Sequence, residues 1–272
     1  MGRVWLVLPA FLFLTAFFAY PVGWLLLRSV TEPRIGIQNY EALFSQPIYA
    51  RLLWNTVVIS ATATFWCVLI GYPVAYTMAN GGARLRRWLI FLVLVPFWTS
   101  ILVRTFAWMV LLQRQGLINA TLLKLGIVSE PIALVHNRLG VLVGMVHVLL
   151  PLMIFPLYAV MTRIDTSYVA AAATLGATPV RNFMRIYLPL SLPGLVGGAT
   201  LVFVSGLGFY ITPALLGGPG DLMIAQMIER QIGLFGNWGI AGALAVVLLA
   251  GTVLCLGVVH RVVGVQATWR RA

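Results

Sequence analysis

The stretch Asp165–Pro189, DTSYVAAAATLGATPVRNFMRIYLP, is polar and lies between two long apolar segments. Asp165 and Thr178 are each placed to begin a helix, because the side-chain oxygen of Asp or Thr accepts hydrogen bonds from the free backbone N–H groups of a first turn. Gly176 supplies the left-handed conformation that ends the first helix, and Pro179 fits the first turn of the second. The sequence therefore predicts two short helices outside the membrane.

Four consecutive alanines, Ala170 to Ala173, form much of the first of these helices. Alanine has the highest helix propensity, and its single methyl group lets a partner approach the backbone closely. Leu188-Pro189 is expected to end the second helix and to lead into the next apolar segment. A helix with this surface, held outside the bilayer between two membrane segments, is suited to being gripped by another protein.

The composition is that of an integral membrane protein. Of the 272 residues, 61% are hydrophobic and 9% are charged, whereas a soluble domain carries about a quarter charged residues. A helical span needs about 20 mostly apolar residues. Six segments qualify: Val4–Leu27, Leu52–Ala79, Trp88–Leu112, Leu139–Met161, Leu190–Leu216 and Ile240–Val263. The sequence therefore predicts an all-α membrane protein of six transmembrane helices, a single domain over residues 1–272 with a connecting loop at 162–189.

The net charge of +12 does not indicate a nucleic-acid partner, because the basic residues cluster at the ends of the apolar segments. With the N-terminus inside, ten lysines and arginines fall on the cytoplasmic side and seven on the outer side. This bias and the tight turn GGARLRR at 81–87 favour cytoplasmic N- and C-termini. The loop at 162–189 is then expected in the cytoplasm.

The segment 190–216 is the best candidate for a route through the membrane. It is rich in glycine and contains Pro213, which predicts an interrupted helix. Broken helices in membranes occur where they line a cavity or are buried in protein. The candidate lining residues here are Ser205, Phe209, Tyr210 and Thr212.

The outer half of segment 88–112 adds a second group of candidates. These are Trp98, Thr99, Arg104, Phe106 and Trp108. The aromatic residues fit either a wall that faces the solute or an interfacial belt, which is the commoner case. Arg104 fits a ligand contact or an internal ion pair, and equally an arginine that snorkels to the surface or caps backbone carbonyls.

The sequence lacks the motifs of an enzyme or of an ATP-binding protein. It has no HExxH or GxSxG motif, no Cys/His cluster and no GKS or GKT phosphate loop. None of the six acids lies well inside an apolar segment, and His147 is expected to bond to a neighbour. The driving energy is therefore expected from outside this chain. The rival, a stand-alone secondary carrier or channel, would need a buried charge that senses a gradient.

The spacing of Ala171, Ala172, Gly176, Ile186 and Leu188-Pro189 resembles the cytoplasmic coupling loop of binding-protein-dependent ABC importer permeases. That loop has the pattern Glu-Ala-Ala, three residues, Gly, nine residues, Ile, one residue, Leu-Pro, and here alanine replaces the glutamate. The resemblance implies a methionine-importer-like, type I permease fold. It also implies that an ATPase docks on Asp165, Ala170, Ala171, Ala172, Gly176, Ala177, Arg181 and Arg185.

Three further regions narrow the resemblance. They are Asn55-Thr56 with 71–76, then 96–100 with 103–105 and 116–119, and finally 209–219. Together they are similar to the first permease of spermidine/putrescine-type importers, a group that also serves opines and GABA-like compounds. This implies a second permease, two ATPase subunits that bind ATP and Mg, a periplasmic binding protein, and a place in the lipid of the bacterial inner membrane.

The solute itself stays open. A polyamine would favour carboxylates or aromatic faces along its route, and this chain offers aromatic residues together with Arg104. Either a partner permease supplies the acids, or the solute is zwitterionic or anionic.

Overall fold

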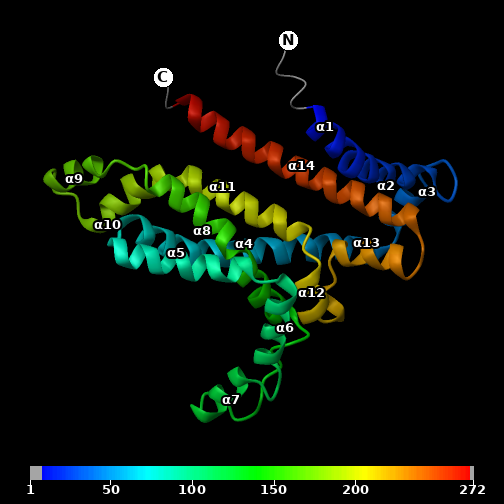
Figure 1. Ribbon diagram of the computed structural model, residues 1–272, viewed down its shortest axis with the longest axis horizontal. Helices are drawn as coiled ribbons and strands as arrows, with labels where there is room; N and C mark the ends of the chain where they lie inside the picture. Colours follow the sequence, from blue (N-terminus) through cyan, green and yellow to red (C-terminus); the bar gives the residue numbers. More distant parts are fainter. Residues whose placement is uncertain (1–7, 270–272) are drawn as a thin grey trace.

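The structure is a computed structural model that describes the backbone of residues 8–269 and the side chains of residues 8–261. Helices and their connections account for this whole described part, and it contains no strand. Three long helices, α4 (Pro47–Asn80), α8 (Arg138–Met161) and α11 (Leu188–Leu207), lie side by side, and α14 (Trp238–Trp269) packs mainly along the helix at 20–31 and also contacts α11 (Figure 1). The main core lies between α4, α8 and α11, which bury Ile59, Met153 and Val202 completely.

The apolar segments form helices that are long enough to cross a membrane. Within the described residues, five helices meet this requirement, or six if one sharply bent pair counts as a span. The first comprises α1 (Leu8–Leu14), a π-helical turn η2 (Thr15–Ala19) and α2 (Tyr20–Thr31). The start of the predicted first span, at 4–7, lies outside the described residues. The all-helical membrane fold expected from the composition is confirmed.

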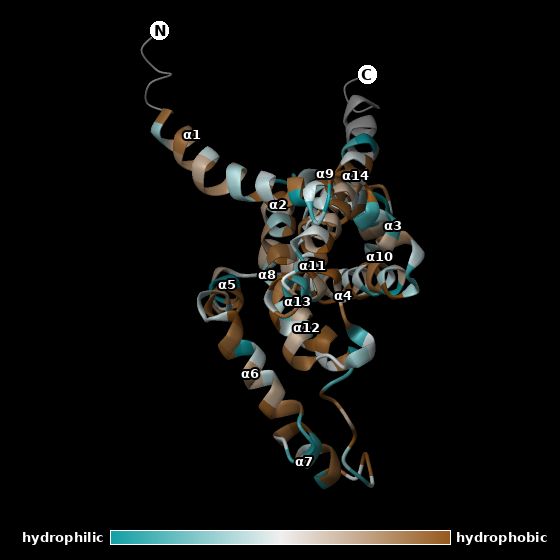
Figure 2. Cartoon of the chain, turned by 90° about the vertical axis from the view of Figure 1, so that its right-hand side faces the viewer, coloured by the Kyte–Doolittle hydropathy of each residue, from teal (hydrophilic) through white to brown (hydrophobic). Residues whose placement is uncertain are grey.

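The predicted span 88–112 is not a single helix. It consists of α5 (Ala83–Trp98) and α6 (Ile101–Leu112), and the chain bends by 100° between them. Thr99 is extended, Ser100 has φ −58° and ψ 137°, and the Thr99 hydroxyl donates to the Pro96 carbonyl at 2.7 Å. As a result α6 and the short helix α7 (Leu117–Lys124) project from the bundle with mostly apolar residues on them (Figure 2).

The predicted span 190–216 is interrupted, but earlier than its proline suggests. Helix α11 ends at Leu207, residues 208–210 connect it to α12, and α12 covers Ile211–Leu216. Pro213 is the third residue of α12 and therefore lies in a first turn, where a backbone N–H has no intrahelical partner to lose. The glycine-containing connection, rather than Pro213, makes the break.

Glycines bring α8 and α11 into close contact. A Cβ atom at Gly194 would lie 2.8 Å from the Val160 Cβ, and one at Gly198 would lie 3.0 Å from the Met153 carbonyl oxygen. Small residues at such seams allow membrane helices to approach each other closely. Gly197 faces open space instead.

The two ends of the bundle carry different structures. At one end lie α3 (Gln38–Ser45), α12, a 3-10 turn η4 (Pro219–Asp221) and α13 (Ile224–Gly233); at the other lie α9 (Thr166–Thr174) and α10 (Pro179–Asn182) (Figure 1). Arg28 joins α2 to α14, because its guanidinium lies 3.6 Å from the Trp24 ring and 4.9 Å from the Trp238 ring.

Candidate functional site

The predicted caps of the coupling loop are formed. The Asp165 carboxylate accepts from the Ser167 backbone N–H at 2.8 Å, and this bond holds the pKa of the Asp165 carboxyl below its usual value. The Thr178 hydroxyl accepts from the Arg181 N–H at 3.4 Å at the start of α10. Gly176 has φ +81°, the left-handed conformation predicted for the end of α9.

The second coupling helix does not end at Leu188-Pro189, contrary to the sequence prediction. From Pro179 to Leu207 the chain is one continuous helix of 29 residues. A π-helical turn η3 (Phe183–Tyr187) precedes the proline, and there the Leu188 N–H donates to the Phe183 carbonyl, five residues back. The wider turn lets the helix continue past Pro189. The second half of the coupling loop and α11 therefore form one continuous helix over residues 179–207, which we call the rod.

Helix α9 lies at the edge of the bundle, where its half-buried Val169 packs against the main core. None of its residues is buried, and Ala170, Ala171 and Ala173 are exposed. Its link to α10 is the amide of Asn182, whose Nδ2 donates to the Val169 carbonyl at 2.8 Å. The alanine surface is therefore open to a partner.

Aromatic side chains brace the start of the rod against α4. Tyr76 lies 5.0 Å from Tyr187 and 5.9 Å from Phe183, measured between ring centroids. The Tyr187 hydroxyl also accepts from Asn80 at 2.7 Å, and Tyr72 bonds to Ser191 at 2.9 Å. These contacts tie the start of the rod to α4.

The candidate path residues gather where the two broken helices meet. Thr105 of α6 and Thr212 of α12 are both buried, and their hydroxyls lie 3.1 Å apart. Trp108 donates its indole N–H to His147 Nδ1 at 3.0 Å, which gives His147 the neighbour predicted for it. A cavity of about 620 Å³, lined mainly by apolar residues of α8, lies beside this pair.

The other candidates are divided between this region and the surface. Phe209 and Ser205 are half-buried near the break, whereas Tyr210, Phe106, Thr99 and Trp98 are exposed. Arg104 is half-buried, and its Nε and Nη1 atoms have no hydrogen-bond partner within the described residues. The structure therefore brings Arg104, Trp108 and Thr212 into one region and leaves Trp98 apart from them at the bend.

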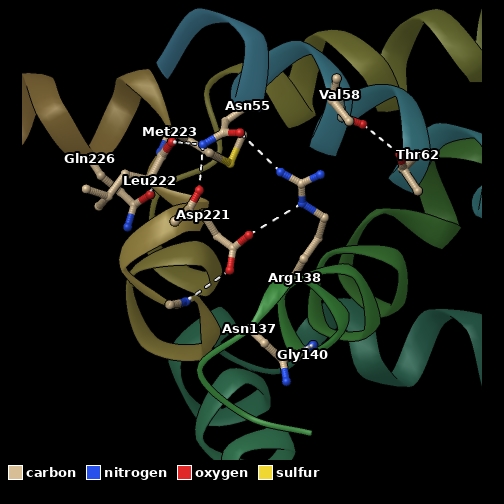
Figure 3. A network of polar contacts seen from close by, with 12 residues as sticks. Asn55, Val58, Thr62, Asn137, Arg138, Gly140, Asp221, Leu222, Met223 and Gln226 are labelled. Carbon is tan, nitrogen blue, oxygen red and sulfur yellow. Dashed lines mark hydrogen bonds and ion pairs between the residues drawn. The ribbon is translucent and has the colours of Figure 1, made fainter. Parts of the chain in front are cut away.

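A polar network joins three segments at the end of the bundle opposite α9 (Figure 3). Arg138, at the start of α8, donates to Asn55 of α4 at 3.1 Å and forms an ion pair with Asp221 at 3.4 Å. Asn55 in turn donates to the Gly220 carbonyl at 2.7 Å, and Thr56 accepts from the Ile224 N–H at 2.9 Å. This network fixes the loop after α12 against α4 and α8.

Sequence reasoning did not find this network or the link made by Asn182. Asn55, Arg138 and Asp221 are far apart in the chain, because Arg138 lies 83 positions after Asn55 and Asp221 lies 83 positions after Arg138. Their one local signal is a polar residue at the end of an apolar segment, which they share with many solvated residues. The pairing depends on how the helices pack.

Known proteins are similar to this chain in sequence and in fold. Residues 68–264 match the family described as "Binding-protein-dependent transport system inner membrane component". The spermidine/putrescine transport system permease protein PotB of Haemophilus influenzae is 37% identical over 227 residues, which cover 84% of this chain and 79% of that protein.

Two solved transporters are similar in fold. One is a bacterial alginate ABC transporter, in complex with an alginate pentasaccharide-bound periplasmic protein. A chain of that transporter matches this chain with a TM-score of 0.75 and 19% sequence identity. The match covers 94% of this chain and 93% of that chain. The MetNI methionine ABC transporter, in an inward-facing conformation, has a TM-score of 0.60 at 22% identity, covering 79% of this chain and 94% of its own.

Proposed function

Because this chain belongs to the family of inner membrane components of binding-protein-dependent transport systems, it is a permease subunit of an ABC importer and not an enzyme, and we propose that the solute it admits is a small organic amine such as a polyamine. The proposal for the solute rests on the 37% identity to a spermidine/putrescine permease over most of both chains. The aromatic residues near the broken helices suit the passage of a cation.

The coupling mechanism rests on one observation, the exposed alanine helix α9 at the head of a continuous rod. We propose that an ATPase subunit grips α9 through Asp165, Ala170, Ala171, Ala172, Gly176, Ala177, Arg181 and Arg185. Closure of the ATPases on ATP then moves the rod formed by α10, η3 and α11. Because α11 packs on α8 through Gly194 and Gly198, both helices move together and open the path at the far end.

The assembly proposed around this chain has four further components. A second permease completes the path, two ATPase subunits bind ATP and Mg, and a periplasmic protein delivers the solute. The N- and C-termini and α9 face the cytoplasm, and the whole chain forms one permease domain. The candidate path residues Trp98, Thr99, Arg104, Phe106, Trp108, Ser205, Phe209, Tyr210 and Thr212 belong to this proposal.

Arg104 favours a second candidate solute, one that carries an anionic group. Its Nε and Nη1 atoms are buried without an acceptor in the described part of the chain, and a buried donor that lacks a partner is costly. A carboxylate or phosphonate would satisfy these donors, whereas a polycation would be repelled. The second candidate is therefore a zwitterion that contains both an amine and an acid.

The test is uptake into proteoliposomes that hold the complete importer, with spermidine, putrescine and a zwitterionic amino acid as competing solutes. We expect uptake of the amines that depends on ATP. Uptake without ATP would support the stand-alone carrier instead, and preference for the zwitterion would support the second candidate.

A bulky substitution in α9 tests the coupling. Ala172→Trp should abolish ATP-driven uptake, because the indole keeps the helix from a close-fitting groove, while the permease pair still assembles. Ala120→Trp, at an exposed alanine of α7, is the matched control and should leave uptake within about twofold of the wild type. Normal uptake by Ala172→Trp would contradict the proposed grip.

A further inference from the structure

A groove with two arginines and two aromatic rings lies at the start of α5. It has a volume of about 420 Å³ and is lined by Arg84, Arg87, Trp88 and Phe91. All four side chains are exposed, and the two rings meet edge to face with their centroids 6.1 Å apart. None of these residues belongs to the coupling loop or to the candidate path, so the groove needs an explanation of its own.

The groove lies at the end of the bundle that carries the coupling loop. Helix α4 ends at Asn80, which bonds to Tyr187 at the start of the rod, and α5 begins three residues later at Ala83. Trp88 is the first residue of the predicted span 88–112, and tryptophan is enriched at the boundary between membrane and water. The two arginines therefore lie at the depth of the lipid headgroups.

The arginines of the groove are available to an anion. Neither Arg84 nor Arg87 forms an ion pair in the described part of the chain, and no acidic side chain lines the groove. Arg87 Nε donates to the Ala83 carbonyl at 3.4 Å, which leaves the two terminal nitrogens of its guanidinium for a ligand. The planar guanidinium matches the oxygens of a phosphate group.

An apolar surface continues from the groove along the same side of α5. Leu92 is 61% exposed and Val95 is 37% exposed, whereas Leu89, Ile90 and Val93 pack against the main core. The free side of α5 is thus charged at its start and apolar beyond it, which is the order of groups in a phospholipid. A soluble partner could contact the arginines but could not reach the apolar residues within the bilayer.

We propose that this groove binds an anionic phospholipid, with the phosphate between Arg84 and Arg87 and an acyl chain along Phe91, Leu92 and Val95. A headgroup that also carries an ammonium group is disfavoured, because the groove has two positive charges and no acid to receive a third. The bound lipid anchors the turn between α4 and α5 beside the contact of Asn80 with the rod. This site goes beyond the proposed transport function and does not depend on which solute is imported.

The test uses the purified chain in detergent, with native mass spectrometry to count bound lipids. The probes are phosphatidylglycerol and phosphatidylcholine with the same acyl chains, and glycerol 3-phosphate as a competitor that has no acyl chain. Phosphatidylglycerol should bind saturably and at least about tenfold more tightly than phosphatidylcholine. Glycerol 3-phosphate should bind at least about 100-fold more weakly, because it buries no hydrocarbon.

Variants assign the binding to this groove. Each arginine near an anionic headgroup contributes about fivefold, so the double variant Arg84→Gln/Arg87→Gln should bind phosphatidylglycerol about 25-fold more weakly. Arg86→Gln/Arg163→Gln is the matched control. It removes the same charge from the same end of the bundle but leaves the groove lining intact, and its affinity should stay within about twofold of the wild type. Because Arg84 and Arg87 are exposed, neither double variant should change the thermal midpoint.

Four results would overturn the proposal. Equal binding of the two lipids would remove the role of the arginines, and equal binding of glycerol 3-phosphate would indicate a site for free phosphate. Equal losses in both double variants would indicate attraction by net charge alone. Unchanged lipid binding in Arg84→Gln/Arg87→Gln, with loss of the ATPase from the complete importer, would make the groove a protein contact. Amine uptake is measured separately, so failure here does not affect the proposed function.

Discussion

At the scale of single residues, the coupling loop depends on a few positions whose backbone conformation or capping bond only certain residue types can supply. Gly176 has φ +81°, and nothing lies within 4 Å of the position that its Cβ would occupy. The requirement for glycine there is therefore conformational rather than steric. Asp165 likewise acts locally, through one backbone N–H.

Gly176→Val should misorient the two coupling helices relative to each other. A β-branched residue resists positive φ, and the left-handed conformation costs about 1–2 kcal/mol for an L-residue. ATP-driven uptake in proteoliposomes should fall severalfold. Gly176→Asn is the matched control, because asparagine tolerates this conformation, and it should retain most of the uptake. Equal losses in both variants would point to packing instead.

The cap at Asp165 predicts a pH dependence of α9. Because the pKa of the Asp165 carboxyl is lowered by its bond to Ser167, the cap is fully formed above the ordinary pKa of aspartate and is lost as the pH falls through the lowered value. The ¹³C shift of the carboxyl and the amide shift of Ser167 should titrate together, below the usual range. In Asp165→Asn the Ser167 shift should not titrate, and a titration there would assign the effect to another group.

At the scale of elements, α8 and α11 form one mechanical unit through their glycine seam. Gly198 meets the backbone of Met153, which cannot rotate away as a side chain can. The π-helical turn η3 keeps the helix continuous from α10 into α11 past Pro189, so in the proposed mechanism α11 moves with α10. The seam then shares this motion with α8.

Gly198→Leu should force α8 and α11 apart at their glycine seam. It should destabilise the bundle by about 1–3 kcal/mol, the usual cost of overpacking. Thermal unfolding of the purified chain in detergent measures this as a lower midpoint. Gly197→Leu, one residue away on the same helix but facing open space, should shift the midpoint little. Similar midpoints for both variants would exclude the close approach of α8 and α11.

At the scale of the whole molecule, the network at the end opposite α9 makes α4, α8 and the loop after α12 one body. The Arg138 side chain is 44% exposed and that of Asp221 is 13% exposed. Solvent screens such a pair, and exposed pairs contribute about 0.2–1 kcal/mol. The network therefore contributes more to the geometry of this end than to stability.

A double-mutant cycle with Arg138→Met and Asp221→Asn measures this pair. We expect a coupling energy below about 1 kcal/mol in unfolding, together with a clear loss of uptake in each single variant, because the loop after α12 is released from α8. Arg34→Met, which removes an exposed positive charge from the same end of the bundle, is the control. Unchanged uptake in both single variants would show that the loop does not need this anchor.

The sequence by itself determined the features that depend on neighbouring residues or on segment length. These are the membrane segments, the caps at Asp165 and Thr178, the left-handed turn at Gly176 and the spacing that identifies the coupling loop. Each follows from local hydrogen bonding, local sterics or the apolar length needed to cross a bilayer.

Only the tertiary structure decided where the helices bend and which distant polar groups meet. Examples are the 100° bend at Thr99-Ser100, the break before α12, and the contact of Arg138 with Asp221. These features depend on packing between segments that are far apart in the chain. A proline signals a possible interruption, but the surrounding helices decide whether the backbone bends there. At Pro189 a π-helical turn keeps the helix continuous, whereas at residues 99–100 the chain turns away from the bundle.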